Sequence, residues 1–374
     1  MTRIHFSEPD TRSLLTHPDV FASLGLHAAR RVRQVLGACP AYAPTKVHPL
    51  STIAHEWGLG QVWAKDERSR LDLRSFKALG GTYAVISLGE AIAMRHGGAT
   101  HSIVDLIRFG HPAVRATTFA AATSGNHGRA VAAGARLVGA RCVVFVKSGV
   151  PKAQLTAIRD LGARVVEVTG TYDDAVAACE VACRQHGWIG VPDCAMQEDD
   201  STVTLVMEGY SLIGAELLEQ LPRPPTHLVL QAGVGGLAAS VGGHVFAQTG
   251  NGARVVVSEP DVAACLQASA MAGRPVRLQP TSSTTMGRLD CYTPSLSAWR
   301  ILEKIVSAWA TVSDEDAEWA CARLAQYDLR TTPSGAAGLA AFKVLMTSPG
   351  ARERLGLDKE SEVAIVVTEA ALES

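Results

Sequence analysis

The chain has 374 residues, which is more than one hydrophobic core usually holds, so we expect two lobes. A formal net charge of −1 gives no basis for binding nucleic acid or an anionic membrane surface, and charged residues at only 19% exclude a disordered chain. No apolar run approaches the roughly 18 residues of a membrane span, and the first residues lack the pattern of a secretory signal. We therefore expect a cytoplasmic protein.

The stretch RSFKALGGTYAV, residues 74–85, places Lys77 just ahead of a small-residue turn and a helix. Taken alone, Lys77 reads as a solvated surface lysine. The alternative is an amine held in a cleft, where it can condense with a carbonyl group.

A second polar motif lies in ATTFAAATSGNHGRAVA, residues 116–132, where Thr123 and Ser124 precede a predicted helix. These hydroxyls and Asn126 could simply cap that helix and form its turn. In the functional interpretation, the hydroxyls and helix amides receive a carboxylate, and the Asn126 amide holds a phenolate-like oxygen.

The middle of the chain alternates short apolar runs with amphipathic stretches. Strands are expected within 141–149, 164–170 and 188–194, with helices between them. After the proline-rich segment LPRPPTH, residues 221–227, a second alternating series begins, and the chain finishes on a helix and the strand EVAIVVTEA. This pattern predicts an α/β, doubly wound fold with mostly parallel sheets in two lobes.

The turn in LVLQAGVGGLAAS, residues 228–240, places Gly233, Gly235 and Gly236 between a strand and a helix. Backbone amides of such a turn can cradle a phosphate, although a tight strand-to-helix turn needs glycine too. The turn also approximates a dinucleotide fingerprint, but Glu259 is followed by Pro260 and is not a convincing ribose ligand, so NAD is not preferred.

The eight cysteines are scattered, without a CxxC pair or a histidine at zinc-ligand spacing. We interpret them as small apolar residues, including Cys179 and Cys183 on one predicted helix, and we expect no metal site.

In combination, the lysine, the Ser-Gly-Asn-His loop and the glycine turn resemble the fold-type II pyridoxal-phosphate enzymes, the threonine dehydratase and tryptophan synthase β group. The resemblance covers nearly the whole chain. The segments FKALGGTYA, GNHGRAVA, LQAGVGG, SEPD and TTMGRLDC are similar to the diaminopropionate ammonia-lyase branch.

This resemblance implies pyridoxal 5'-phosphate as cofactor, a homodimer, and two lobes that are open twisted sheets flanked by helices. The large cofactor-binding domain would comprise 1–83 and 221–374, and the small domain 84–220.

The resemblance also assigns roles to single residues. Lys77 would be the Schiff-base lysine and would remove the α-proton. Phe76 would lie against the cofactor or serve only as a core residue. The amides for the cofactor phosphate would come from Gly233, Val234, Gly235, Gly236 and Leu237.

Asn126 would bond the 3' oxygen of the cofactor, and Thr123, Ser124 and Gly125 would receive the substrate carboxylate. For His127 a structural hydrogen bond is favoured over a substrate contact. Thr368 would offer its hydroxyl to the pyridine nitrogen, which suits β-elimination better than transamination, unless it only packs in its strand.

Three departures from the branch bear on the substrate. Ser124 stands where the branch has an Asp that serves as a second base. Asp193 matches the acid near the β-amino group, or else ends a strand. Arg288 and Asp290 stand in a segment where small residues are usual, either as a surface salt link or with Arg288 meeting a distal carboxylate. The tail is the third departure, since it ends at VTEAALES where the family commonly has Gly and more acids.

We therefore expect an ammonia-lyase that eliminates both amines of 2,3-diaminopropionate or a related β-substituted amino acid. A serine/threonine-type dehydratase is the alternative, because of Ser124, and a racemase is a third reading. From another class, a nucleotide-binding regulatory protein would use the glycine turn without lysine chemistry.

Overall fold

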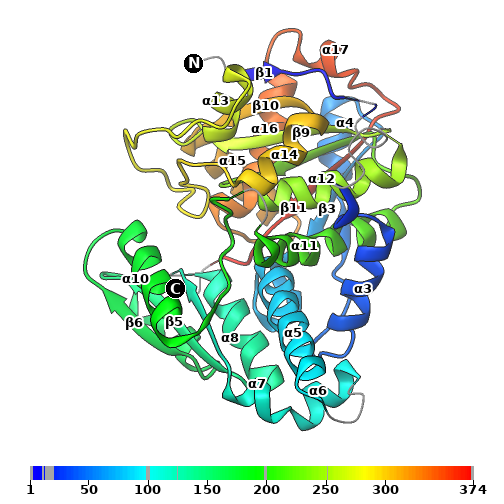
Figure 1. The fold of residues 1–374 in the computed structure, drawn as a ribbon. Helices are drawn as coiled ribbons and strands as arrows, with labels where there is room; N and C mark the ends of the chain where they lie inside the picture. Colours follow the sequence, from blue (N-terminus) through cyan, green and yellow to red (C-terminus); the bar gives the residue numbers. More distant parts are fainter. Residues whose placement is uncertain are drawn as a thin grey trace.

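The computed structural model describes residues 3–10, 12, 21–97, 102–123, 125–197, 200–250 and 252–371, and it shows two lobes, each built on its own sheet (Figure 1). The large sheet has the order β1-β10-β9-β8-β11-β3-β2, and the small sheet β6-β5-β4-β7. The short edge strands β1 and β2 pair antiparallel, and the remaining pairs are parallel. The expected α/β architecture with mostly parallel sheets is confirmed.

The strands of the large sheet are β1 (Ile4–Phe6), β2 (Val47–Pro49), β3 (Gln61–Asp66), β8 (His227–Gln231), β9 (Arg254–Pro260), β10 (Val306–Val312) and β11 (Glu362–Val367). Those of the small sheet are β4 (Thr118–Ala122), β5 (Arg141–Lys147), β6 (Arg164–Val168) and β7 (Ile189–Gly190).

The helices are α3 (Leu26–Leu36), α4 (Ser51–Trp57), α5 (Lys77–Arg95), α6 (Ile103–Phe109), α7 (Pro112–Ala116), α8 (Asn126–Val138), α9 (Lys152–Arg159), α10 (Tyr172–His186), α11 (Ser201–Gln220), α12 (Gly236–Thr249), α13 (Cys265–Ala272), α14 (Leu296–Ile305), α15 (Asp314–Ala325), α16 (Pro333–Thr347) and α17 (Ala351–Leu355). A 3₁₀ segment, η1 (Glu67–Asp72), follows β3.

The buried strands serve two cores because successive side chains point to opposite faces of a sheet. In β8, Leu228 and Leu230 join the core under α12 and α11, whereas Val229 joins the core under α16. In the small sheet, Val144 faces α8 and Val143 faces α10. Both faces of each sheet are therefore covered, which explains the continuous apolar runs in these strands.

The carboxyl ends of parallel strands from both sheets meet between the lobes, where Lys77 contacts Asp193 and Asn126 contacts Glu369. In the large lobe, Lys77 follows β3 and η1, Gly233 follows β8, and Thr368 follows β11. In the small lobe, Asn126 follows β4 and Asp193 follows β7. This edge of a parallel sheet is where open α/β folds bind ligands. The predicted domain boundaries, at 83/84 and 220/221, stay predictions. Helix α11, which ends at the second boundary, packs on both α5 and α12.

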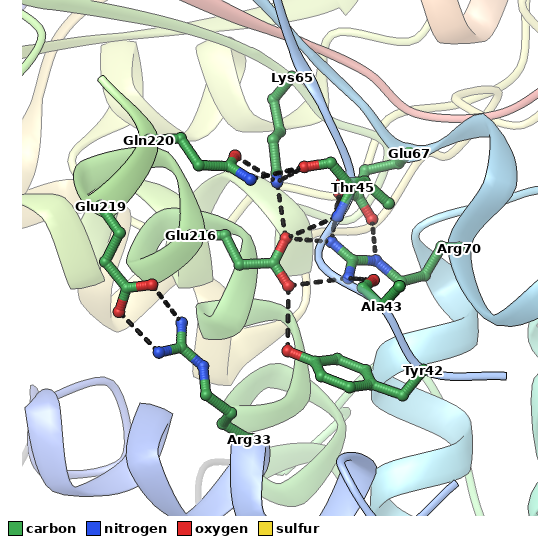
Figure 2. A network of polar contacts seen from close by, with 10 residues as sticks. All are labelled: Arg33, Tyr42, Ala43, Thr45, Lys65, Glu67, Arg70, Glu216, Glu219 and Gln220. Atoms are coloured by element: carbon green, nitrogen blue, oxygen red, sulfur yellow. Dashed lines mark hydrogen bonds and ion pairs between the residues drawn. The ribbon is translucent and has the colours of Figure 1, made fainter. Parts of the chain in front are cut away.

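A buried ionic network fixes the segment that leads to Lys77 (Figure 2). The Arg70 guanidinium of η1 donates to the Glu216 carboxylate on α11 at 2.7 Å and to Glu67 at 2.7 Å, and the Lys65 ammonium donates to Glu216 at 2.6 Å. All four side chains are at most 1% exposed. Their charges balance, as burial of ions requires.

Within the part of the chain that the structure describes, no helix combines the length and apolarity needed to cross a bilayer.

Candidate active site

The site begins with a tightly held turn before Lys77. Leu71, Asp72 and Arg74 have φ of +49°, +57° and +62°, a conformation that non-glycine residues adopt rarely. The turn is locked to the end of β11, because the Phe76 N–H donates to the Thr368 carbonyl at 2.9 Å and Ser75 bridges to Glu369. Lys77 is then the first residue of α5, at the junction of the lobes.

The Lys77 ammonium donates a hydrogen bond to the Asp193 carboxylate across that junction. Their side chains are 26% and 16% exposed. Burial lowers the pKa of Lys77, but the charge of Asp193 outweighs it, and the pKa ends above its usual value. Burial raises the pKa of Asp193, yet Lys77 holds it well below the usual range. Lys77 is therefore an ion-paired and partly buried residue, and not the freely solvated surface lysine of the alternative interpretation.

The glycine turn forms a cradle beside this pair. Gly235 has φ +103°, and a Cβ atom there would lie 3.0 Å from the Leu302 side chain. A Cβ on Gly233 would lie 2.9 Å from the Cys291 sulfur. Gly235 therefore disfavours a side chain, whereas one at Gly233 would have to displace the Cys291 thiol, and the helix α12 that follows points its amino end at the turn. Val234 and Leu237 belong to the same turn, and Leu237 is buried in the core.

Tyr210 of α11 closes the cradle and was missed by the sequence analysis. It packs on Phe76, with ring centroids 4.9 Å apart, and it lies 3.9 Å from the position of a Cβ on Gly236. Its hydroxyl is buried without a hydrogen-bond partner. Burial raises the pKa of this phenol, and the charges of Lys77 and Asp193 act on it in opposite directions. An orphaned buried hydroxyl beside an amide-lined turn fits an absent polar group such as a cofactor phosphate.

The segment around Thr123 and Gly125 precedes helix α8 in the small lobe, and we call it the carboxylate loop after the ligand expected from the sequence. The Gly125 N–H donates to the Thr123 hydroxyl at 3.2 Å, and helix α8 starts at Asn126. Ser124 lies outside the described residues. His127 is buried, and its Nε2 lies 2.7 Å from the Val191 carbonyl oxygen, which is the structural hydrogen bond that the sequence favoured.

Glu369, directly after Thr368, is a second residue that the sequence analysis missed. Its carboxylate accepts hydrogen bonds from the Asn126 amide, the Thr332 hydroxyl and, at 2.7 Å, the Arg288 Nε. The Glu369 side chain is only 4% exposed. Glu369 therefore brings Asn126 and Arg288 together. In the sequence, only its position after a buried strand could have indicated it.

Arg288 and Asp290 do not form a salt link with each other. Arg288 pairs with Glu369, and the Asp290 carboxylate accepts from the Tyr292 hydroxyl at 2.6 Å.

Thr368 is buried, with its hydroxyl 3.5 Å from the Gln231 amide nitrogen. Glu259 accepts the N–H groups of Leu266 and Gln267, so it caps α13 and is not placed as a ribose ligand.

All eight cysteines are free thiols, and the described residues contain no cluster of three or more metal-ligating side chains.

Comparison with known proteins places this arrangement in context. The family model for pyridoxal-phosphate dependent enzymes matches residues 38–369. A diaminopropionate ammonia-lyase of Escherichia coli strain K12 is 31% identical over 91% of this chain and 88% of that protein. A probable D-serine dehydratase of Acidovorax ebreus is 28% identical over 69% of this chain and 60% of that protein.

Among solved structures, the Escherichia coli diaminopropionate ammonia-lyase in complex with an aminoacrylate-PLP azomethine reaction intermediate superposes with a TM-score of 0.85. The sequence identity is 29%, and the match covers 99% of this chain and 94% of that one.

Proposed function

Because this chain belongs to the family of pyridoxal-phosphate dependent enzymes, we propose that it is an ammonia-lyase that releases both amino groups of 2,3-diaminopropionate and leaves a 2-oxo acid. The observation that carries the proposal is the Lys77–Asp193 pair beside the glycine cradle. Lys77 would be the amine that condensation with the cofactor requires, and Asp193 would be the acid that serves the leaving amine.

The residues present fit the cofactor. The amides of the turn Gly233–Leu237 would hold its phosphate, Asn126 its ring oxygen and Thr368 its ring nitrogen, with Phe76 beside the ring. The buried Tyr210 hydroxyl, which has no hydrogen-bond partner, would find one in that phosphate. When bound, pyridoxal phosphate supplies the electron sink that makes an α-proton removable.

Lys77 and Asp193 would divide the proton transfers between them. The amine must be neutral to act as nucleophile or base, so its proton would have to pass to Asp193 along the hydrogen bond that joins them, against the preference of the pair for its two charged forms. The protonated Asp193 then donates to the β-amino group as that group leaves. The neutral Nζ amine of Lys77 would then act as the base that removes the α-proton.

The carboxylate loop would bind the substrate. Thr123, Ser124 and Gly125, with the amino end of α8, would receive the α-carboxylate. His127 would hold the loop to the strand end through its bond to Val191 and would not touch substrate. Arg288 would contribute positive charge beside Gly125, since its Nη1 lies 2.7 Å from the place of a Cβ on that residue.

A dehydratase acting on a β-hydroxy amino acid is the second candidate function. The observation that favours it is Ser124 in place of an acid, together with the similarity to a probable D-serine dehydratase. A racemase would use Lys77 and Ser124 on opposite faces of the α-carbon.

The experiment compares initial rates of the holoenzyme on 2,3-diaminopropionate and on serine, run in parallel. We expect kcat/KM to be at least about tenfold higher for the diamine, because Asp193, once protonated, would donate its proton to a leaving amine. A higher value for serine would replace the ammonia-lyase with the dehydratase. A colourless protein that turns over neither compound would indicate the nucleotide-binding alternative.

We also propose that the protein is a cytoplasmic homodimer. Eight free thiols fit a reducing compartment. Light scattering should give about twice the chain mass of 39.4 kDa, and a value at the chain mass would exclude the dimer.

A further inference from the structure

Glu369 is a buried acid that accepts hydrogen bonds from three separate segments where the lobes meet. Its side chain is 4% exposed, and its Oε1 accepts from the Arg288 Nε at 2.7 Å and from the Thr332 hydroxyl. Its Oε2 accepts from the Asn126 amide of the small lobe. The proton transfers proposed above do not use Glu369, so the burial of this carboxylate calls for another explanation.

The backbone of Glu369 is held in place on both sides. The Thr331 hydroxyl donates to the Glu369 carbonyl oxygen, and Ser75 pairs with Glu369 in an isolated antiparallel bridge. Ser75 lies two residues before Lys77, so the carboxylate is fixed relative to the segment that presents the reactive amine.

Arg288 serves as the counter-ion of this acid. Its Nε lies 2.6 Å from the Glu369 Oε2, and the pair carries no net charge. A carboxylate that is neutralised in this way stays ionised when buried and remains a strong acceptor. It can therefore lie close to an electron-rich ring oxygen without adding net negative charge there.

The bond to Glu369 sets the orientation of the Asn126 amide. The amide nitrogen of an asparagine carries two N–H groups, whereas its oxygen can only accept. Glu369 accepts one N–H of Asn126, and the second N–H is left for another acceptor such as the cofactor ring oxygen. Without the acid, the amide could turn and present its own oxygen, which would repel that ring oxygen.

We propose that Glu369, with Arg288 as its counter-ion, is a positioning residue that holds the Asn126 amide with an N–H available to the ring oxygen of pyridoxal phosphate. This inference rests on the cofactor role that the proposed function gives to Asn126. Glu369 acts through Asn126 and takes no part in the proton transfers.

Spectral titration of the cofactor-free protein with pyridoxal phosphate tests this role. We expect Glu369→Gln to weaken binding at least about tenfold, because Gln offers one acceptor oxygen to three donors. Glu369→Asp keeps the charge beside Arg288 and the fold, but its carboxylate is one methylene shorter and should lose Asn126. It should weaken binding at least about threefold.

The matched control is Glu362→Gln, at the opposite end of β11. Glu362 has a side chain that is 8% exposed, pairs with Arg223 at 2.7 Å, and accepts from the Trp63 indole N–H at 2.6 Å. Loss of this buried acid should reduce the urea midpoint, as loss of Glu369 does. Cofactor affinity should stay within about twofold of the wild type, because the site is distant.

A double-mutant cycle separates positioning from a merely structural effect. If Glu369 acts through Asn126, the two substitutions are not additive in cofactor affinity. In an Asn126→Ala background, Glu369→Gln should therefore change the affinity by less than about twofold.

Equal affinities of Glu369→Gln and Glu362→Gln, or full additivity in the cycle, would overturn the inference and leave the ammonia-lyase proposal intact. A weakened, non-additive affinity in a protein that releases no ammonia from 2,3-diaminopropionate would support the positioning role and contradict the proposed function.

Discussion

Lys77 and Asp193 lie on different lobes, and their charged groups meet in a single hydrogen bond. Lys77 opens α5 after the tight turn that follows β3, whereas Asp193 follows the short edge strand β7 of the small sheet. Each raises the population of the other's charged form, against the cost of burial. The pair is therefore both a contact between the lobes and the acid–base couple that the proposed elimination needs.

Asp193→Asn should lower kcat for 2,3-diaminopropionate by about 10²–10⁴, the range for loss of a general acid. Asn keeps the shape of the side chain but cannot deliver a proton to the leaving amine. The matched control is Asp290→Asn, because Asp290 bonds Tyr292 and lies outside the proposed machinery. If both variants lose activity equally, Asp193 has no special role.

The same substitution should move the titration of Lys77. Burial lowers the pKa of the amine and Asp193 raises it, so removing the Asp193 charge leaves the lowering effect of burial. In the cofactor-free protein, Lys77 of Asp193→Asn should react with an amine reagent at a lower pH than in the wild type. Peptide mapping of the modified lysine across a pH series measures this shift, and a shift to higher pH would contradict the account.

Gly235→Ala should weaken cofactor binding by at least about tenfold, since it strains a left-handed residue and pushes a Cβ against Leu302. Gly250→Ala provides the control at the other end of α12. Gly250 also has positive φ, +62°, but a Cβ there meets nothing within 4 Å. It should cost about 1 kcal/mol of stability and leave cofactor affinity unchanged. Spectral titration of both variants with pyridoxal phosphate measures the two affinities. Equal affinities would contradict the proposal that the turn binds the cofactor phosphate.

Glu216→Gln should lower the free energy of unfolding by about 3–5 kcal/mol, because the buried Lys65 and Arg70 would share only Glu67. Glu219 lies three residues after Glu216 on α11 and forms an exposed ion pair with Arg33. Glu219→Gln should cost less than about 1 kcal/mol. Urea unfolding of the two variants tests the contrast, and similar losses would mean that burial of the network contributes little.

Glu259 predicts a specific dependence of stability on pH. Burial raises its pKa from 4.5 to about 8 in the folded chain. The protonated side chain therefore contributes stability that is fully present below pH 4.5 and is lost as the pH rises through 8. Glu259→Gln should flatten this decline when unfolding is measured from pH 5 to pH 8. A wild type that gains stability over the variant as pH rises would show that the N–H groups of α13 keep Glu259 ionised.

The parts of the site that local sequence determines were predictable. A turn of three glycines between a buried strand and a helix, and a Lys before a small-residue helix, each carry their chemistry within a dozen residues. Packing around them is not local. Tyr210 stands within an apolar helix, where an aromatic residue is ordinary, and its closeness to Phe76 depends on how α11 meets α5.

The acid Glu369 shows the same limit. Its three partners, Asn126, Arg288 and Thr332, come from segments far apart in the chain. The sequence identified Asn126 and Arg288 separately, but only the fold shows that one buried carboxylate joins them. The buried network around Arg70 and Glu216 likewise joins positions 146 residues apart, which no periodicity or motif indicates.

The central claim is tested most directly by the ratio of ammonia to pyruvate formed when the holoenzyme consumes 2,3-diaminopropionate. Loss of both amino groups predicts a ratio of about two throughout the reaction, because the leaving β-amine and the hydrolysed α-nitrogen both appear as ammonia. A ratio of about one, or ammonia without pyruvate, would contradict the elimination that Lys77 and Asp193 are proposed to perform.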